Sequence, residues 1–255
     1  MQNQLAYHYL KGINLLLVQP LSTWNFGCNS RQWLAPCYTL CMSGTHPNIA
    51  YAVTLMVQMS ANPTLEHLDK ALYICCYLIS TCDYLLVFDG NSGNGLITCT
   101  DSDWAGSPED SKSTTGFYIK LANTVSLWNS HQQRTVALLS TEAEYMALSD
   151  CSCQIIWIRN MFGEINFNLL PIPICGNNQG SIFMRNNPVT EHRTKHIPIR
   201  FHYIRDAVQK HQVEIFYIEG TDNPANMFTK NLGYVKFERC RSQLALVFHN
   251  ATRWN

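Results

Sequence analysis

The order of strand-like and helix-like segments constrains the fold of this chain more than any other sequence feature. From residue 96 onward, short apolar runs typical of strands alternate with longer runs whose apolar residues have helical spacing. The predicted order is strand, strand, strand, helix, strand, helix, helix, strand, helix, at 96–100, 116–121, 124–128, 140–162, 171–175, 179–184, 196–209, 213–218 and 223–232. Three consecutive strands followed by alternating helices and strands predict an α/β fold with a mixed sheet and helices packed on its faces.

The residues before this region divide into an irregular part and a helical part. Residues 1–35 show no regular spacing of apolar side chains, so we expect an irregular segment there. Asn48 is placed to cap a helix over 48–59, and Thr64 to cap a second helix with His67 at the capping-box position. A strand at 84–88 and a last helix at 234–248 are also predicted. The predicted organisation is an irregular segment (1–35), a mainly helical segment (36–90), the α/β domain (91–232) and a C-terminal helix and tail (233–255).

The composition indicates a folded intracellular protein. The 255 residues are 46% hydrophobic and 14% charged, which is a globular rather than a disordered composition. The 11 cysteines are an odd number in a chain too large to need disulfides, so we expect reduced thiols and a cytoplasmic or nuclear location. There is no signal-peptide pattern, and no apolar run approaches the ~18 residues of a membrane span, so no membrane partner is expected.

The charge is zero overall but unevenly distributed. From residue 156 onward the chain holds 12 Lys or Arg against 7 Asp or Glu, and 185–210 alone holds six Lys or Arg. This basic stretch fits a surface that grips a nucleic-acid backbone, and it equally fits a solvated helix face. The sequence leaves these two interpretations open.

Several short motifs occur together in a fixed order, and four segments carry the candidate catalytic positions. These four are 100–106 with Asp101, 140–145 with Glu144, 175–179 with Asn177, and 223–230 with Asn226. Supporting motifs are Gly44-Thr45-His46-Pro47-Asn48, Asn187-Pro188-Val189, Lys195-His196-Ile197 and Phe228-Thr229-Lys230. In this order and spacing they resemble the ribonuclease H domain, preceded by the tail of the reverse transcriptase, of copia-type retrotransposon Pol polyproteins. The resemblance covers roughly residues 38–246, and 36–90 resembles the end of the polymerase thumb or connection region.

The resemblance implies a ribonuclease H-like fold and a site that hydrolyses RNA in RNA–DNA hybrids. That chemistry uses a water held between two Mg²⁺ ions roughly 3.5–4 Å apart. The four ligand positions would be Asp101, Glu144, Asn177 and Asn226, where the family has Asp at the last two. An amide oxygen brings no negative charge, and hard dications favour carboxylates. We therefore expect Mg²⁺, or Mn²⁺, to be weakly held or lost, with Asp101 and Glu144 as the remaining metal ligands.

The activity expected from this site is correspondingly reduced. If each lost ligand costs about 2–3 kcal/mol of transition-state stabilisation, the two changes cost about 10³–10⁴ in rate. The leading interpretation is an inactive nuclease. One alternative is an active hybrid-specific ribonuclease that works with Asn ligands or with Mn²⁺. Another is a module that binds nucleic acid or a protein without cutting.

Other residues receive roles only through the resemblance. Gln179 would contact the RNA minor groove, and Arg193, Lys195 and His196 would hold the hybrid backbone near the site. The acids Asp103 and Asp222 are expected to lie off the site. Other parts of a Pol polyprotein are the expected protein partners. The polymerase Tyr-x-Asp-Asp turn is absent from this sequence, so no polymerase activity is expected.

Overall fold

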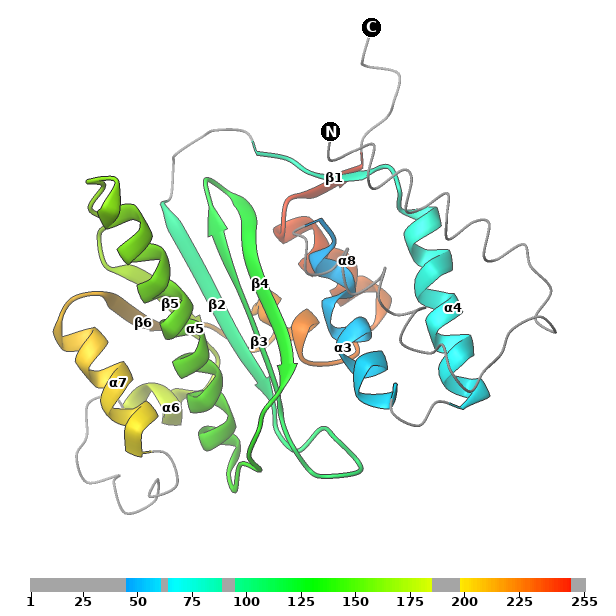
Figure 1. Cartoon of the computed structure of the whole chain (residues 1–255), viewed down its shortest axis with the longest axis horizontal. Helices are drawn as coiled ribbons and strands as arrows, with labels where there is room; N and C mark the ends of the chain where they lie inside the picture. Colours follow the sequence, from blue (N-terminus) through cyan, green and yellow to red (C-terminus); the bar gives the residue numbers. More distant parts are fainter. Residues whose placement is uncertain (1–44, 61–63, 89–94, 185–197, 249–255) are drawn as a thin grey trace, which may run out of the picture. The chain divides into compact units, whose positions relative to one another are not determined.

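The computed structural model describes residues 45–60, 64–88, 95–184 and 198–248. The chain divides into two compact units (Figure 1). One unit is Met1–Leu86 with Leu246–Asn255, and the other is Val87–Ala245. Within the described ranges, no helix is both long enough and apolar enough to cross a membrane.

The larger unit is built on a five-stranded mixed sheet with the order β4-β3-β2-β5-β6. Its strands are β2 (Leu96–Asp103), β3 (Thr114–Leu121), β4 (Thr124–Gln132), β5 (Ile172–Gly176) and β6 (Val213–Tyr217). The first three pair antiparallel, whereas β5 runs parallel to β2 and β6 parallel to β5. The predicted mixed sheet is therefore confirmed, and β2 lies at its centre because the chain reverses direction twice before the helical crossover.

Helices cover both faces of this sheet (Figure 1). They are α5 (Ser140–Glu164), α6 (Gln179–Met184), α7 (Pro198–Gln209), the 3-10 helix η4 (Pro224–Phe228) and α8 (Tyr234–Gln243). Helix α5 packs on β2 and β3 from one face, and η4 packs on the same two strands from the other. Two layers of contact thus hold β2, the strand that carries Asp101, from both faces.

The core lies between α5 and the sheet. Tyr145, Leu148, Cys151 and Ile155 recur at spacings of three and four, so they form one stripe of α5, and all are buried. The strands contribute alternate residues to the same cluster, among them Phe117, Ile119, Ile172, Ile174, Val213 and Ile215. Each fully buried large side chain contributes about 1.5–3 kcal/mol. This burial fixes the register of the strands and therefore which side chains face η4.

Several predicted boundaries shift in the structure. Helix α5 ends at Glu164, two residues beyond its predicted end at 162. The predicted helix at 223–232 is the short 3-10 helix η4. The predicted last helix ends at Gln243, where Ala245 has a φ of 60° and redirects the chain into strand β7 (Leu246–Phe248). The helix ends early because residues 246–248 pair with the strand at 84–86. The spacing of apolar residues within the segment does not reveal that pairing.

The smaller unit contains η2 (Pro47–Ile49), α3 (Ala50–Met59), α4 (Leu65–Ser80) and β1 (Tyr84–Leu86), which pairs antiparallel with β7. The capping box predicted at Thr64 is confirmed, since Thr64 Oγ1 accepts from the His67 amide and His67 Nδ1 accepts from the Thr64 amide. The cap predicted at Asn48 is wrong. Asn48 is buried inside η2 and donates to the Tyr77 hydroxyl at 2.6 Å.

Candidate active site

Asp101 is the centre of the candidate site and is fully buried. Because β2 and β5 run parallel, their carboxyl ends meet at one edge of the sheet, and Asn177 directly follows β5. The Asn177 amide Nδ2 donates to Asp101 Oδ1 at 2.9 Å. The Thr229 hydroxyl donates to Asp101 Oδ2, and Lys230 Nζ lies 3.2 Å from that same oxygen. Both carboxylate oxygens of Asp101 thus have donors from this chain.

Glu144 lies on α5 beside this carboxylate. Burial raises the pKa of Glu144 to about 9, the negative charge of Asp101 adds to the rise, and the Lys230 ammonium opposes it. The backbone amide of Ser102 also donates to Glu144. The structure therefore brings Asp101 and Glu144 close enough for their charges to interact, as the ligand positions inferred from the resemblance require.

Asn226 lies on η4 and is held by the backbone. Its Nδ2 donates to the carbonyl oxygens of Gly220 at 2.6 Å and Asn223 at 2.7 Å. Asn223 in turn accepts from the Ala225 amide at 3.0 Å and donates to the Thr100 carbonyl at 2.9 Å, which ties η4 to β2. The amide nitrogens of Asn177 and Asn226 therefore both act as donors, a role that an ionised Asp cannot take.

Three residues at this site received no role from the sequence: Asn223, Thr229 and Lys230. The Asn223-Pro224 pair is a turn signal that could have indicated a backbone-capping role. Thr229 and Lys230 lie in the quoted motif at 228–230, but nothing in their local sequence shows that both reach Asp101. Their positions follow from η4 packing against β2.

The two neighbouring acids differ in how far they lie from the site. Asp103 is closer than expected, because side chains two apart in a strand share a face, and Asp103 therefore faces the same side as Asp101. Burial raises the pKa of Asp103, and the charges of both Lys230 and Asp101 act on it. Asp222 lies off the site as expected, with its Oδ1 2.7 Å from Arg239 Nη2.

The predicted nucleic-acid contacts are only partly within the described residues. Gln179 begins α6, two residues after Asn177, and its side chain is exposed. Arg193, Lys195 and His196 lie outside the described residues.

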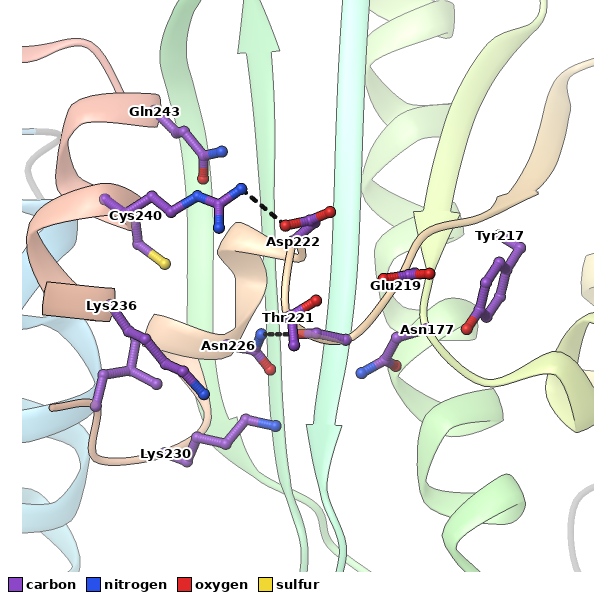
Figure 2. A pocket seen from close by; sticks show the side chains of 13 residues that line it. Asn177, Tyr217, Glu219, Thr221, Asp222, Asn226, Lys230, Lys236, Cys240 and Gln243 are labelled. Carbon is purple, nitrogen blue, oxygen red and sulfur yellow. Dashed lines mark hydrogen bonds and ion pairs between the residues drawn. The ribbon is translucent and has the colours of Figure 1, made fainter.

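A pocket of about 520 Å³ adjoins the site (Figure 2). Asn177, Asn226 and Lys230 form its inner side, and α8 forms its outer wall. Its other lining residues are Tyr217, Glu219, Gly220, Thr221, Asp222, Leu232, Lys236, Arg239, Cys240 and Gln243. The pocket therefore joins the candidate site to a polar surface that carries three cationic side chains.

The residues present do not fit a pair of divalent cations. Among the described residues, no three His, Cys, Asp or Glu side chains converge on a point that could hold a metal ion. The Asp101 carboxylate already accepts from an amide and a hydroxyl and lies beside an ammonium group. A dication at Asp101 would have to displace these donors and would find amides at two of the four ligand positions.

The sheet order, with a buried Asp on the central strand and a Glu on the crossover helix beside it, defines a ribonuclease H-like domain. No family model matches the chain. The chain is 33% identical, over 202 residues and 79% of its length, to the retrovirus-related Pol polyprotein from transposon TNT 1-94 of Nicotiana tabacum. It is 32% identical, over 204 residues and 79% of its length, to that from transposon RE1 of Arabidopsis thaliana. The homologues of this chain are thus copia-type Pol polyproteins, and the chain spans 15% and 14% of the length of these two relatives.

A likeness to solved structures accompanies this relationship. A crystal structure of LC11-RNase H1 in complex with an RNA/DNA hybrid is 15% identical to the chain, with a TM-score of 0.38. The likeness covers 52% of this chain and 93% of that one.

Proposed function

We propose that this chain is a ribonuclease H-like domain that no longer cleaves RNA at an appreciable rate. The hydrogen bond from Asn177 Nδ2 to Asp101 Oδ1 carries this proposal. Two carboxylates at this separation repel each other and need a cation between them, whereas an amide and a carboxylate attract each other without one. The charge of Asp101 is thus balanced by donors from this chain, although the buried Oδ1 of Asn177 itself accepts no hydrogen bond from the described residues.

Lys230 strengthens this interpretation. Its ammonium nitrogen lies 3.2 Å from Asp101 Oδ2 and supplies positive charge where a metal-dependent nuclease needs a dication. A divalent ion entering the site would be repelled by Lys230, and only two of the four ligand positions, Asp101 and Glu144, hold acids. The ancestral substrate, an RNA–DNA hybrid, and the ancestral Mg²⁺ or Mn²⁺ dependence are inferred from the family resemblance.

The test is cleavage of an end-labelled RNA–DNA hybrid in Mg²⁺ and, separately, in Mn²⁺. The natural chain is compared with the double variant Asn177→Asp/Asn226→Asp and with the same variant carrying Asp101→Asn. We expect the double variant alone to cut, at a rate about 10³–10⁴ above the natural chain if each restored ligand is worth about 2–3 kcal/mol. Comparable cutting by the natural chain and the double variant would contradict the proposal. So would failure of the double variant to cut although circular dichroism and Mn²⁺-dependent thermal stabilisation show it folded and metal-bound.

A further inference from the structure

The pocket beside the candidate site has two unlike sides (Figure 2). Lys236 projects from α8 on one side, and Lys230 extends below it from the segment after η4. Arg239, which also lines the pocket, belongs to α8 as well. Tyr217, the last residue of edge strand β6, lies at the opposite end. The volume of about 520 Å³ falls within the roughly 300–1,000 Å³ of ordinary ligand pockets.

Two cations on α8, Lys236 and Arg239, are available to an anion. Lys236 forms no ion pair with any carboxylate in the described part of the chain. Arg239 pairs with Asp222, but their side chains are 58% and 49% exposed, and exposed pairs are held weakly. The lining acids are Glu219 and Asp222, while Lys230 lies 3.2 Å from the buried carboxylate of Asp101, so Lys236 is the lining cation that has no carboxylate partner among the described residues. The positive side chains concentrate near α8, where a phosphate would be attracted.

The opposite end of the pocket offers an aromatic surface. Tyr217 is 49% exposed although its ring is large, and polar groups surround it in the pocket. A nucleobase stacks on such a ring irrespective of sequence, while cations follow the phosphates of its backbone. An aromatic ring at one end and cations at the other suit a single nucleic-acid strand, because its unpaired bases can stack on the ring while its phosphates meet the cations. A paired duplex keeps its base faces stacked on one another and so leaves none free for Tyr217.

We propose that this pocket binds single-stranded nucleic acid, with phosphates at Lys236 and Arg239 and a base stacked on Tyr217. The choice of nucleic acid as ligand rests on the proposed function, since the pocket shares Asn177, Asn226 and Lys230 with the candidate site. The binding needs no metal, because every cation in it is a side chain. The pocket therefore gives the domain a role that survives the loss of cleavage.

The test is fluorescence anisotropy with labelled 12-nucleotide single-stranded DNA and RNA, in EDTA and at several salt concentrations. We expect Lys236→Gln and Arg239→Gln each to weaken binding several-fold and to reduce the salt slope by about 0.7, the contribution of one phosphate contact to a single strand. Tyr217→Ala should weaken binding on the order of tenfold at every salt concentration, because stacking is not screened. Asp222→Asn should strengthen binding, since it removes a negative charge and frees Arg239 from its ion pair.

Matched controls separate this pocket from general surface charge. Lys70→Gln removes an exposed Lys, and Tyr234→Ala an exposed Tyr, neither of which lines the pocket. Both should bind like the natural chain. Binding that is unchanged in Lys236→Gln, Arg239→Gln and Tyr217→Ala, or reduced equally by the controls, would overturn the proposal, as would tighter binding of a fully paired duplex. Because EDTA prevents cleavage, these results stand apart from the nuclease test, and the two proposals can fail independently.

Discussion

The amide Nδ2 of Asn177 donates a hydrogen bond to Oδ1 of Asp101 at 2.9 Å, joining residues that are 76 positions apart in sequence. Asp101 is fully buried and Asn177 half-buried, so water reaches this bond only in part. A charge-assisted bond in such a place contributes about 1.5–3 kcal/mol. The amide at position 177 therefore stabilises the site, and it can do so because it carries no negative charge.

The first prediction is that Asn177→Asp destabilises the protein when metal is absent. The change replaces an attraction with a repulsion between two carboxylates, and we expect the free energy of unfolding to fall by about 1–3 kcal/mol in EDTA at pH 8. The loss should be smaller at pH 5, where one carboxyl can take up a proton, and smaller again with added Mn²⁺. Urea denaturation measures it, with Asn177→Ala as the uncharged control. Equal stability of Asn177→Asp and the natural chain in EDTA at pH 8 would show that this bond is not formed.

The second prediction concerns Glu144 and pH. Burial raises the pKa of Glu144 to about 9 in the folded protein, whereas an unfolded Glu titrates near its ordinary value of about 4.3. Between these values the folded state binds more protons at Glu144 than the unfolded state does. The contribution of Glu144 to the free energy of unfolding is therefore complete below about pH 4 and declines as the pH rises toward 9. Glu144→Gln, which stays neutral, should flatten this decline. Denaturation curves from pH 5 to 9 in EDTA test it, and parallel pH profiles for both proteins would refute it.

The third prediction compares a glycine that is tightly packed, Gly116, with one that has open space around it, Gly163. A Cβ on Gly116 would lie 2.6 Å from Thr229 Cγ2 and 2.7 Å from Phe228 Cβ, so Gly116→Ala should push η4 off the sheet and cost about 1–3 kcal/mol. A Cβ on Gly163 would meet nothing within 4 Å inside helix α5, so Gly163→Ala should stabilise by about 0.5–1 kcal/mol. Thermal unfolding of the two variants gives the comparison. A Gly116→Ala variant as stable as the natural chain would mean that η4 does not pack closely on β3.

The fourth prediction concerns the smaller unit. Thr64→Ala removes the side-chain oxygen that accepts from the His67 amide, and we expect a loss of about 1 kcal/mol of helix stability. Hydrogen exchange of the His67 amide should quicken accordingly, while an exposed change near the end of the preceding helix α3, Gln58→Ala, should leave it unaltered. Unchanged exchange at His67 in Thr64→Ala would show that the capping box contributes nothing.

The sequence predicted the elements of the fold well where one local pattern is decisive. The strands from β2 to β6 and helices α5 to α7 follow apolar spacings that each segment carries within itself. The Thr64 capping box was predictable for the same reason, since its partners are three residues apart. The prediction failed at 246–248, where pairing with the distant strand β1 overrides the helical spacing of the segment.

By itself, the sequence determined the order of strands and helices, the family, and the presence of amides at two of the four candidate ligand positions. Only the tertiary structure decided what those amides do. The Asn177 and Thr229 bonds to Asp101 span 76 and 128 residues, and the pairing of Asp222 with Arg239 depends on how α8 packs on η4. Such contacts follow from strand register and helix packing, which are set by burial across the whole domain. The apolar periodicity of one segment does not contain that information, so the donors around Asp101 emerge only when the sheet is assembled.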